Sequence, residues 1–254
     1  CKIIWKIGDI MTINSFLVVG FLVWFLFFFL PLHLVLWLIG KKNLEKKFKI
    51  SHKIIDWAFG CCIFFNQVKI DIYNQDLVPN DEPILFVPNH RSYWDILVLH
   101  NSIKAPVGFV AKVEMKKVPL LNWWMEDIGC VFLDRVNPKE GLKAILQGAD
   151  YLKNGHCMVL CPEGTRNHND DMLPFKEGSL KMAEKAKCKI VPVALIGTDD
   201  LLEKNPKFKM YKGKVKVVFG EPFYVSDIPA EYKKKSAAYA QTKVQALLDE
   251  YKNK

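Results

Sequence analysis

The sequence predicts an α/β fold, in which a mainly parallel sheet is flanked by helices and follows an N-terminal membrane-associated helical element. From residue 66 onward, short apolar runs typical of buried strands alternate with stretches of helical periodicity. Before that region, no Asp, Glu, Lys or Arg occurs between Ile10 and Gly40. The 254 residues are enough for one full core and an appendage. We therefore expect a membrane anchor with a basic amphipathic connector at residues 1–65 and an α/β domain at residues 66–254.

The first 65 residues contain the predicted anchor. The segment from Phe16 to Gly40 is almost continuously apolar, and a helix needs about 20 such residues to cross a bilayer. Four lysines follow it directly: Lys41, Lys42, Lys46 and Lys47. Basic residues beside an apolar span mark its cytoplasmic end, so we expect the α/β domain on the cytoplasmic face of a membrane.

Pro31 and His33 interrupt this apolar run, which leaves two interpretations. One kinked anchor helix is favoured over a re-entrant or interfacial helix pair that enters one leaflet, although hydropathy does not separate the two. A cleaved signal peptide fits poorly, because the run is too long and no small-residue cleavage site follows it. Residues 41–65 form an amphipathic connector that lies either on the bilayer or on the domain.

Seven apolar runs in the remaining chain are predicted to be strands. They are residues 67–73, 84–87, 107–111, 130–133, 157–161, 190–196 and 215–219. Pro192 predicts an edge or strand-start position, because proline cannot donate to a ladder. The intervening helices are expected after residue 95, at 119–127, at 138–154, around 180–186 and at 231–251. Asn137, Pro138 and Glu140 form a favourable helix start with Asn137 as the N-cap.

A histidine and an aspartate lie where the second predicted strand meets the next helix. His90 and Asp95 are five residues apart, so within one helix they would point about 140° away from each other. They meet only if His90 lies in the loop and Asp95 in the first helical turn, with Ser92 as the N-cap. An imidazole oriented by a carboxylate is a general base for an alcohol. The alternative is that Asp95 is only a favourable carboxylate at a helix start.

The loop from Cys161 to Arg166 follows another apolar run and carries candidate binding groups. Gly164 favours a tight turn, while Thr165 and Arg166 offer a hydroxyl and a guanidinium suited to a phosphate. An ordinary loop with a solvated ion pair between Glu163 and Arg166 is equally consistent with the pattern.

Two other segments give weaker signals. The run from Gly129 to Arg135 is a strand followed by Asp134 and Arg135. Arg135 can thereby add a second cation to the one that Arg166 supplies. Such Asp-Arg pairs are commonly surface salt bridges, so this segment alone is not specific. The run from Val191 to Leu195 is expected to be a core strand rather than part of a site.

Composition and motifs exclude several classes of function. The net charge of +9 favours anionic partners, but we expect no nucleic acid because the lysines are dispersed rather than gathered in a stripe with aromatics. No Gly-rich nucleotide fingerprint, P-loop or nucleophile elbow occurs. Seven scattered cysteines argue against a disulfide framework and for a reducing compartment. No zinc site is expected at His156, Cys157, Cys161 and His168, since about four strand steps of 3.3 Å would separate the two thiolates.

Taken in order, four segments resemble the motif blocks of the 1-acylglycerol-3-phosphate acyltransferase family of glycerolipid acyltransferases. Asn89-His90-Arg91-Ser92-x-x-Asp95 resembles the first block, NHxxxxD, and Pro162-Glu163-Gly164-Thr165-Arg166 resembles the third. Gly129 to Arg135 resembles the second block, and Val191-Pro192-Val193 resembles the fourth. The resemblance covers about residues 66–225.

Smaller features also agree with the family pattern, and two depart from it. Lys112, in Ala-Lys-x-Glu, and Phe175-Lys176-x-Gly178 fit the family. Cys161 stands where an aromatic residue is common, and Asn167 stands where serine is common. Neither departure removes a charge or the turn, so they bear on the acceptor rather than on the reaction.

The resemblance implies acyl transfer from a thioester, either acyl-CoA or acyl-carrier protein, to the free hydroxyl of lysophosphatidic acid, which gives phosphatidic acid. Asp95 would orient His90, and His90 would take the proton of the hydroxyl. The implied acceptor site consists of Lys112, Arg135, Glu163, Gly164, Thr165 and Arg166, with the arginines on the phosphate. The family uses no metal or cofactor and forms no acyl-enzyme. The alternatives are transfer to another lysolipid or to glycerol-3-phosphate, and a non-catalytic membrane-anchored lipid-binding protein.

Overall fold

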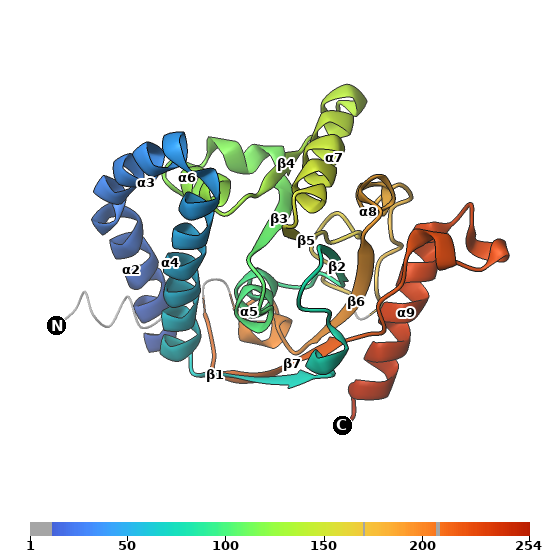
Figure 1. Cartoon of the computed structure of the whole chain (residues 1–254). Helices are drawn as coiled ribbons and strands as arrows, with labels where there is room; N and C mark the ends of the chain where they lie inside the picture. The colour runs from blue at the N-terminus through green and yellow to red at the C-terminus, as the bar shows by residue number, and fades with distance from the viewer. Residues whose placement is uncertain (1–11, 170, 207–208) are drawn as a thin grey trace.

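The computed structural model describes residues 12–169, 171–206 and 209–254. These residues form one seven-stranded sheet in the order β1-β7-β6-β2-β5-β3-β4, flanked by helices (Figure 1). The strands are β1 (Val68–Tyr73), β2 (Ile84–Pro88), β3 (Val107–Lys112), β4 (Val131–Leu133), β5 (Cys157–Val159), β6 (Lys189–Ile196) and β7 (Gly213–Phe219). Neighbouring strands are parallel except for β6 and β7, which are antiparallel. The predicted α/β fold with a mainly parallel sheet is therefore confirmed.

Helices cover both faces of this sheet. Five of them come after β2 in the chain: α5 (Trp94–Ser102), α6 (Leu121–Asp127), α7 (Pro138–Lys153), α8 (Lys181–Ala186) and α9 (Ser236–Tyr251). Side chains alternate along β2, so Ile84 and Phe86 enter one core with residues of α5, whereas Leu85 and Val87 enter another with residues of α7, α8 and α9. A strand buried on both faces explains why β2 reads as a continuous apolar run.

The helix α7 begins as the sequence predicts. Asn137 is its N-cap, and the side-chain oxygen of Asn137 accepts hydrogen bonds from the backbone N–H groups of Lys139 and Glu140. Pro138 occupies the first helical turn, where its missing N–H costs nothing.

The expectation that Pro192 marks an edge or the start of a strand is wrong. Pro192 lies inside β6, which is an interior strand between β7 and β2. The antiparallel ladder with β7 begins at Val193, and an isolated bridge joins Ile190 to Phe223 before it. Pro192 therefore falls between these two pairings on the β7 side, where its carbonyl accepts from Gly220 N–H and no donor is required of it.

The apolar N-terminal run forms two helices, α2 (Ile13–Phe28) and α3 (Leu30–Lys42), here called the N-terminal pair. They are bent by 53° where they meet. Among the described residues, no single helix has the length and apolar composition to cross a bilayer, although the two bent helices meet that test together. Both a broken span and a re-entrant pair fit this bend.

The connector helix α4 (Leu44–Phe65) packs on the α/β domain. Phe48, Ile55, Ala58 and Cys62 are buried, and α4 lies against α5, β1 and α6 (Figure 1). The sequence left open whether residues 41–65 lie on the bilayer or on the domain, and in the structure they pack on the domain. The core that contains Ile55 also contains Val18 of α2, so the N-terminal pair and the sheet share one continuous apolar interior.

Three polar side chains of the N-terminal pair, those of His33, Asn14 and Ser15, contact the protein. His33 Nδ1 lies 2.9 Å from Oδ2 of Asp127 at the end of α6, and Lys47 Nζ from α4 lies 2.6 Å from Oδ1 of the same carboxylate. On α2, Asn14 donates to the carbonyl of Asn66, and Ser15 Oγ accepts from Met210 N–H. These contacts join the N-terminal pair to the domain at both of its ends.

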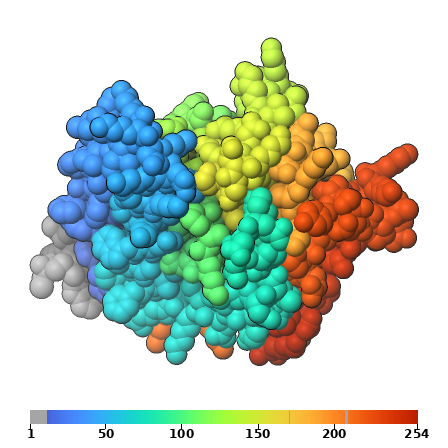
Figure 2. Space-filling model, in the orientation of Figure 1, coloured from blue at the N-terminus to red at the C-terminus, as the bar shows by residue number. Residues whose placement is uncertain are grey.

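Many apolar side chains of the N-terminal pair point away from the protein. Thirteen large apolar residues of these helices are exposed: Ile13, Phe16, Leu17, Val19, Val23, Trp24, Phe27, Phe28, Leu30, Leu34, Val35, Trp37 and Leu38. In the space-filling view these helices form the blue end of the molecule (Figure 2). The pair therefore has a second apolar side, exposed to the outside, in addition to the buried Val18, Phe25 and Leu36 that face the core.

Candidate active site

The His90–Asp95 pair lies at the carboxyl end of β2. His90 Nδ1 is 2.8 Å from Asp95 Oδ2, and the same oxygen accepts from the backbone N–H groups of Arg91 and Ser92 at 2.7 and 2.9 Å. Asp95 is fully buried, whereas the His90 side chain is partly exposed. These three donors hold the carboxylate in place. It fixes Nδ1 and leaves Nε2 as the nitrogen that faces a substrate.

The start of α5 brings this pair together. His90 lies in the segment before the helix, and Asp95 is its second residue, as the pairing requires. The expected N-cap was Ser92, but the helix begins one residue later and Tyr93 occupies the cap position without a side-chain cap. Ser92 Oγ instead accepts from Trp94 N–H at 3.0 Å. The Ser-x-x-Asp pattern therefore describes a reciprocal turn just before the helix rather than the cap itself.

Asn89 fixes the backbone immediately before His90. Its side-chain amide donates to the carbonyl of Leu195 at 3.0 Å and accepts from the N–H of Leu195 at 2.8 Å. This exchange continues the β2–β6 ladder past the end of β2 with a side chain in place of backbone. Asn89 is buried, so both of its bonds are shielded from water.

Glu163 braces His90 from the neighbouring strand end. Its Oε1 accepts from His90 N–H at 2.7 Å, and its Oε2 accepts from Leu173 N–H at 3.0 Å. Burial raises the pKa of Glu163, and the two N–H donors oppose that rise. The backbone of the same loop returns to His90, because Asn167 N–H donates to the His90 carbonyl at 2.8 Å. Glu163 is thus buried beneath the pair, and the ion pair with Arg166 considered from the sequence is not formed.

Cys161 lies among the charged groups of the site. Burial raises the pKa of its thiol well above the usual range, and the carboxylates of Asp95 and Glu163 raise it further, while Arg135 opposes them. A thiol with a raised pKa stays protonated and is a poor nucleophile. The group with acid-base chemistry in this cluster is therefore the imidazole.

The remaining predicted site residues lie along one edge of the sheet. β2, β3, β4, β5 and β6 all run in the same direction, so their carboxyl ends share that edge. Lys112 ends β3 and pairs in register with Leu133 of β4, two residues before Arg135. Gly164 has a φ of +76°, which suits glycine, and Thr165 beside it is exposed. Both Lys112 and Arg135 are exposed.

The cations of this edge fall into two groups. Arg91 and Arg166 lie on the β6 side of His90, and each is paired with a carboxylate: Arg91 Nε with Asp199 at 2.9 Å, and Arg166 Nη1 with Glu203 at 3.2 Å. On the β3–β4 side, Lys112 and Arg135 have no carboxylate within 4 Å among residues 12–169, 171–206 and 209–254. β5, which precedes the Arg166 loop, and β4 are two strands apart in the sheet, about 10 Å at the usual spacing.

Sequence reasoning missed Asp199 and Glu203. Both follow β6, on the η3 turn (Asp199–Leu201) and just after it. A signal was present, because polar residues after the carboxyl end of a parallel strand are site candidates, and Thr198, Asp199 and Asp200 follow β6 directly. Tyr93 was also missed, although its ring lies 3.6 Å beneath the Arg166 guanidinium carbon.

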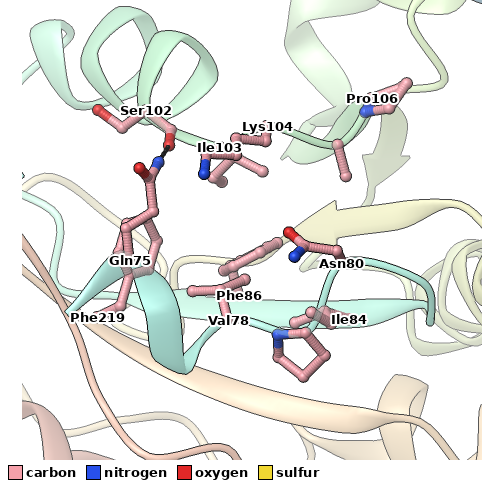
Figure 3. Close-up of a pocket in the computed structure, with 12 residues that line it drawn as sticks. Gln75, Val78, Asn80, Ile84, Phe86, Ser102, Ile103, Lys104, Pro106 and Phe219 are labelled. Atoms are coloured by element: carbon pink, nitrogen blue, oxygen red, sulfur yellow. Dashed lines mark hydrogen bonds between the residues drawn. The ribbon is translucent and has the colours of Figure 1, made fainter.

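Two cavities lie at the opposite edge of the sheet from His90. One of about 330 Å³ opens beside the start of β2, where Gln75 donates a 2.8 Å hydrogen bond to the Ser102 carbonyl over Phe86 (Figure 3). Another of about 570 Å³ lies between α4 and the ends of α6 and α7. Neither is lined by a predicted site residue. Within the described part of the chain, no group of three or more His, Cys, Asp or Glu could hold a metal ion.

Comparisons with known proteins agree on one family. The family model described as Acyltransferase matches residues 69–196. A 1-acyl-sn-glycerol-3-phosphate acyltransferase of Chlamydomonas reinhardtii is 33% identical over 162 residues, which cover 64% of this chain and 48% of that protein. A probable 1-acyl-sn-glycerol-3-phosphate acyltransferase of Mycoplasma genitalium is 31% identical over 70% of this chain and 68% of that protein. The chain spans about half the length of the first of these relatives.

A solved structure has the same fold. The 1-acyl-sn-glycerophosphate acyltransferase PlsC from Thermotoga maritima superposes with a TM-score of 0.76. The match covers 95% of this chain and 98% of that chain at 24% identity. Because it covers nearly all of both chains, the N-terminal helices as well as the sheet belong to the shared architecture.

Proposed function

This chain belongs to the acyltransferase family, and on that premise we propose that it transfers a fatty acyl group from a thioester to lysophosphatidic acid. The product is phosphatidic acid, and the donor is acyl-CoA or acyl-carrier protein. The observation that carries the proposal is the 2.8 Å contact between His90 Nδ1 and Asp95 Oδ2 at the sheet edge. Relatives that bear this activity in their names support the choice of acceptor.

The reaction needs one base and no covalent intermediate on the protein. His90 Nε2 accepts the proton of the acceptor hydroxyl as its oxygen attacks the thioester carbonyl. Asp95 stabilises the imidazolium that forms, because its carboxylate faces Nδ1. The new ester bond forms as the carbon–sulfur bond breaks, and the proton held by His90 passes to the departing thiolate.

The charged groups of the edge bind the acceptor phosphate in this proposal. Lys112 and Arg135 have no carboxylate partner among the described residues, so their charge is available to an anion. Arg166 contributes the face and donors that Glu203 does not use. Glu163 and Gly164 act by shaping the loop that carries Thr165 and Arg166, rather than by touching phosphate, since both are buried.

A membrane surface supplies the lipid substrates. The exposed apolar side of the N-terminal pair suits insertion among acyl chains, and the side chains of His33 and Asn14 already have partners in the protein. The exposed lysines Lys41 and Lys42 at the end of α3 suit anionic headgroups, and Lys41 already lies 3.6 Å over Trp37. The proposed location is therefore a membrane, with the α/β domain on its cytoplasmic face.

The proposal is tested with purified protein, lysophosphatidic acid and an acyl-CoA, by measuring released thiol and phosphatidic acid. Acyl-carrier protein as donor is assayed in parallel. The variant His90→Ala should keep its melting temperature and lose transfer by a factor of about 10² to 10⁴. His156→Ala is the matched control, because His156 lies at the start of β5, on the opposite edge of the sheet. Ordinary turnover by His90→Ala would end the proposal.

A further inference from the structure

Glu203 is a buried carboxylate that contacts two of the motif segments. Its Oε1 accepts from the backbone N–H of Tyr93 at 2.9 Å and lies 3.2 Å from Arg166 Nη1. Its side chain is only 6% exposed, and its buried Oε2 has no hydrogen-bond partner among the residues that the structure describes. One carboxylate oxygen therefore joins the start of α5, which carries Asp95, to the arginine of the loop after β5.

The segment that carries Glu203 is firmly anchored. Leu201 is fully buried in the core, and its carbonyl accepts from Tyr211 N–H. Gly197, with a φ of +83°, makes the turn out of β6, where an added Cβ would lie 2.9 Å from the Lys214 carbonyl. The N–H of Lys204, the residue after Glu203, returns to the Asp199 carbonyl at 3.0 Å. Glu203 is thus presented by a fixed turn, which is what an orienting contact requires.

The guanidinium of Arg166 is held on two sides. Its carbon lies 3.6 Å from the Tyr93 ring centroid, so one face of the plane is covered by the aromatic ring. Glu203 engages one Nη1 donor of the five N–H donors that an arginine has. Among the described residues the other donors have no hydrogen-bond partner, and the side chain is still 28% exposed, so an anion can reach it.

A carboxylate in this place can either orient the arginine or compete with the phosphate for it. Competition requires that Glu203 be displaced when the anion binds. Displacement would leave the Tyr93 N–H and a buried carboxylate without their partners, which is costly. An anchored, buried carboxylate that also accepts from the backbone therefore favours orientation.

We propose that Glu203 is a positioning residue for the acceptor phosphate. It holds the Arg166 guanidinium flat on Tyr93 with its unused donors directed to the anion. The inference rests on the proposed function, because it assigns Arg166 to the acceptor. It predicts that Glu203 acts on acceptor binding, through Arg166, and not on the thioester or on the proton transfer at His90.

The test is steady-state kinetics of the full chain with lysophosphatidic acid and an acyl-CoA. In Glu203→Ala we expect the KM for lysophosphatidic acid to rise roughly tenfold, with kcat and the KM for acyl-CoA changed by less than about twofold. Glu203→Gln keeps an acceptor for Tyr93 N–H and Arg166, so its KM should lie between those of the unmodified chain and Glu203→Ala. Asp200→Asn is the matched control, since Asp200 belongs to the same turn and pairs with Lys204, but contacts neither Tyr93 nor Arg166.

A double-mutant cycle separates positioning from a general loss of structure. If Glu203 acts through Arg166, then Glu203→Ala should add nothing to the KM in an Arg166→Ala background. Melting temperatures of all variants are measured alongside. If Glu203→Ala does not fold, the KM of Glu203→Gln decides between positioning and competition. A lower KM in Glu203→Gln would overturn positioning in favour of competition. Additive effects of the two residues, or a loss confined to kcat, would also overturn it.

A binding measurement keeps this inference distinct from the proposed reaction. Glycerol 3-phosphate should raise the melting temperature of the unmodified chain, and should raise it less in Glu203→Gln and Arg166→Ala. If the unmodified chain transfers no acyl group but this pattern holds, the proposed reaction fails and the role of Glu203 stands. If glycerol 3-phosphate stabilises all of these proteins equally, or none of them, the role of Glu203 is rejected.

Discussion

His90 Nδ1 and Asp95 Oδ2 are 2.8 Å apart, although the two residues are five positions apart in the chain. On one helix their side chains would diverge by about 140°. They meet because His90 lies in the segment between β2 and α5, while Asp95 lies in the first turn of the helix. Buried bonds from Asn89 and Glu163 fix that segment from two sides. The geometry of the pair thus depends on groups that never reach a substrate.

The carboxylate of Asp95 is predicted to be required for turnover rather than for binding. In Asp95→Asn the side-chain oxygen can still accept one backbone N–H, but the charge that stabilises the imidazolium is lost. We expect kcat to fall by about 10²- to 10⁴-fold while the KM for lysophosphatidic acid changes little. Thiol release measures this, with the exposed α7 carboxylate variant Asp150→Asn as control. Retention of most of the kcat would contradict the assigned role.

The amide of Asn89 is predicted to contribute strongly to stability. Asn89→Ala leaves the N–H and carbonyl of Leu195 buried at this point without their side-chain partner. The expected cost is about 1–3 kcal/mol, which corresponds to a melting temperature lower by several degrees. Calorimetry of Asn89→Ala beside the exposed Asn80→Ala checks this. An unchanged melting temperature for Asn89→Ala would show that water replaces the lost bonds.

Buried His52 is predicted to make the fold sensitive to mild acid. Burial lowers the pKa of His52 from 6.5 to about 3, with the neighbouring His100 adding to this and Asp56 opposing it. Between pH 6.5 and pH 3, His52 therefore binds a proton in the unfolded chain but stays neutral in the folded chain. The stability contributed by neutral His52 is complete above pH 6.5 and is lost as the pH falls toward 3, by about 2 kcal/mol at pH 5.

Denaturant unfolding of His52→Phe at pH 7 and pH 5 tests this linkage. His100 is stacked on the His52 ring and Phe48 meets it edge-on, so an aromatic replacement keeps the packing. The variant should lose less stability between the two pH values than the unmodified chain does. A variant at the exposed His168, His168→Gln, should behave as the unmodified chain. Equal acid sensitivity in His52→Phe would assign the effect to other groups.

The exposed side of the N-terminal pair is predicted to bind lipid. Phe28 is 62% exposed and makes part of that side, so Phe28→Asp should weaken sedimentation with anionic phospholipid vesicles without lowering the melting temperature. Leu146→Asp on α7, where the leucine is also exposed, is the control. If Phe28→Asp binds vesicles as the unmodified chain does, the lipid surface lies elsewhere on the molecule.

The strands and most helices were predictable because their physics is local. Apolar runs bounded by turn residues identify β2 and β7, and Asn137 with Pro138 marks the start of α7. The prediction for Pro192 was wrong because the position of a strand in a sheet, interior or edge, depends on strands that are remote in sequence. The break in the ladder that accommodates Pro192 involves Phe223 and Gly220, which no local pattern connects to it.

The site was predictable to the extent that its groups follow strand ends. That rule predicted His90, Arg135 and Arg166, which do lie at the carboxyl edge of the sheet, and it would also have pointed to Asp199. The ion pair of Arg166 with Glu203 could not be predicted, because Glu163, only three residues away in sequence, is the more obvious partner. Glu163 is instead committed to the His90 and Leu173 N–H groups, which only the folded loop brings to it.

The shared carboxylate of Asp127 has a mechanical consequence. By holding His33 of α3 and Lys47 of α4 at once, it locks the helices that would enter lipid to the end of α6. Such a joint ties the position of the N-terminal pair to that of the α/β domain, so in the proposed membrane-bound state it would help to set the height of the His90 edge above the headgroups. On the proposed function, lysolipid would then reach that edge by lateral diffusion within the bilayer.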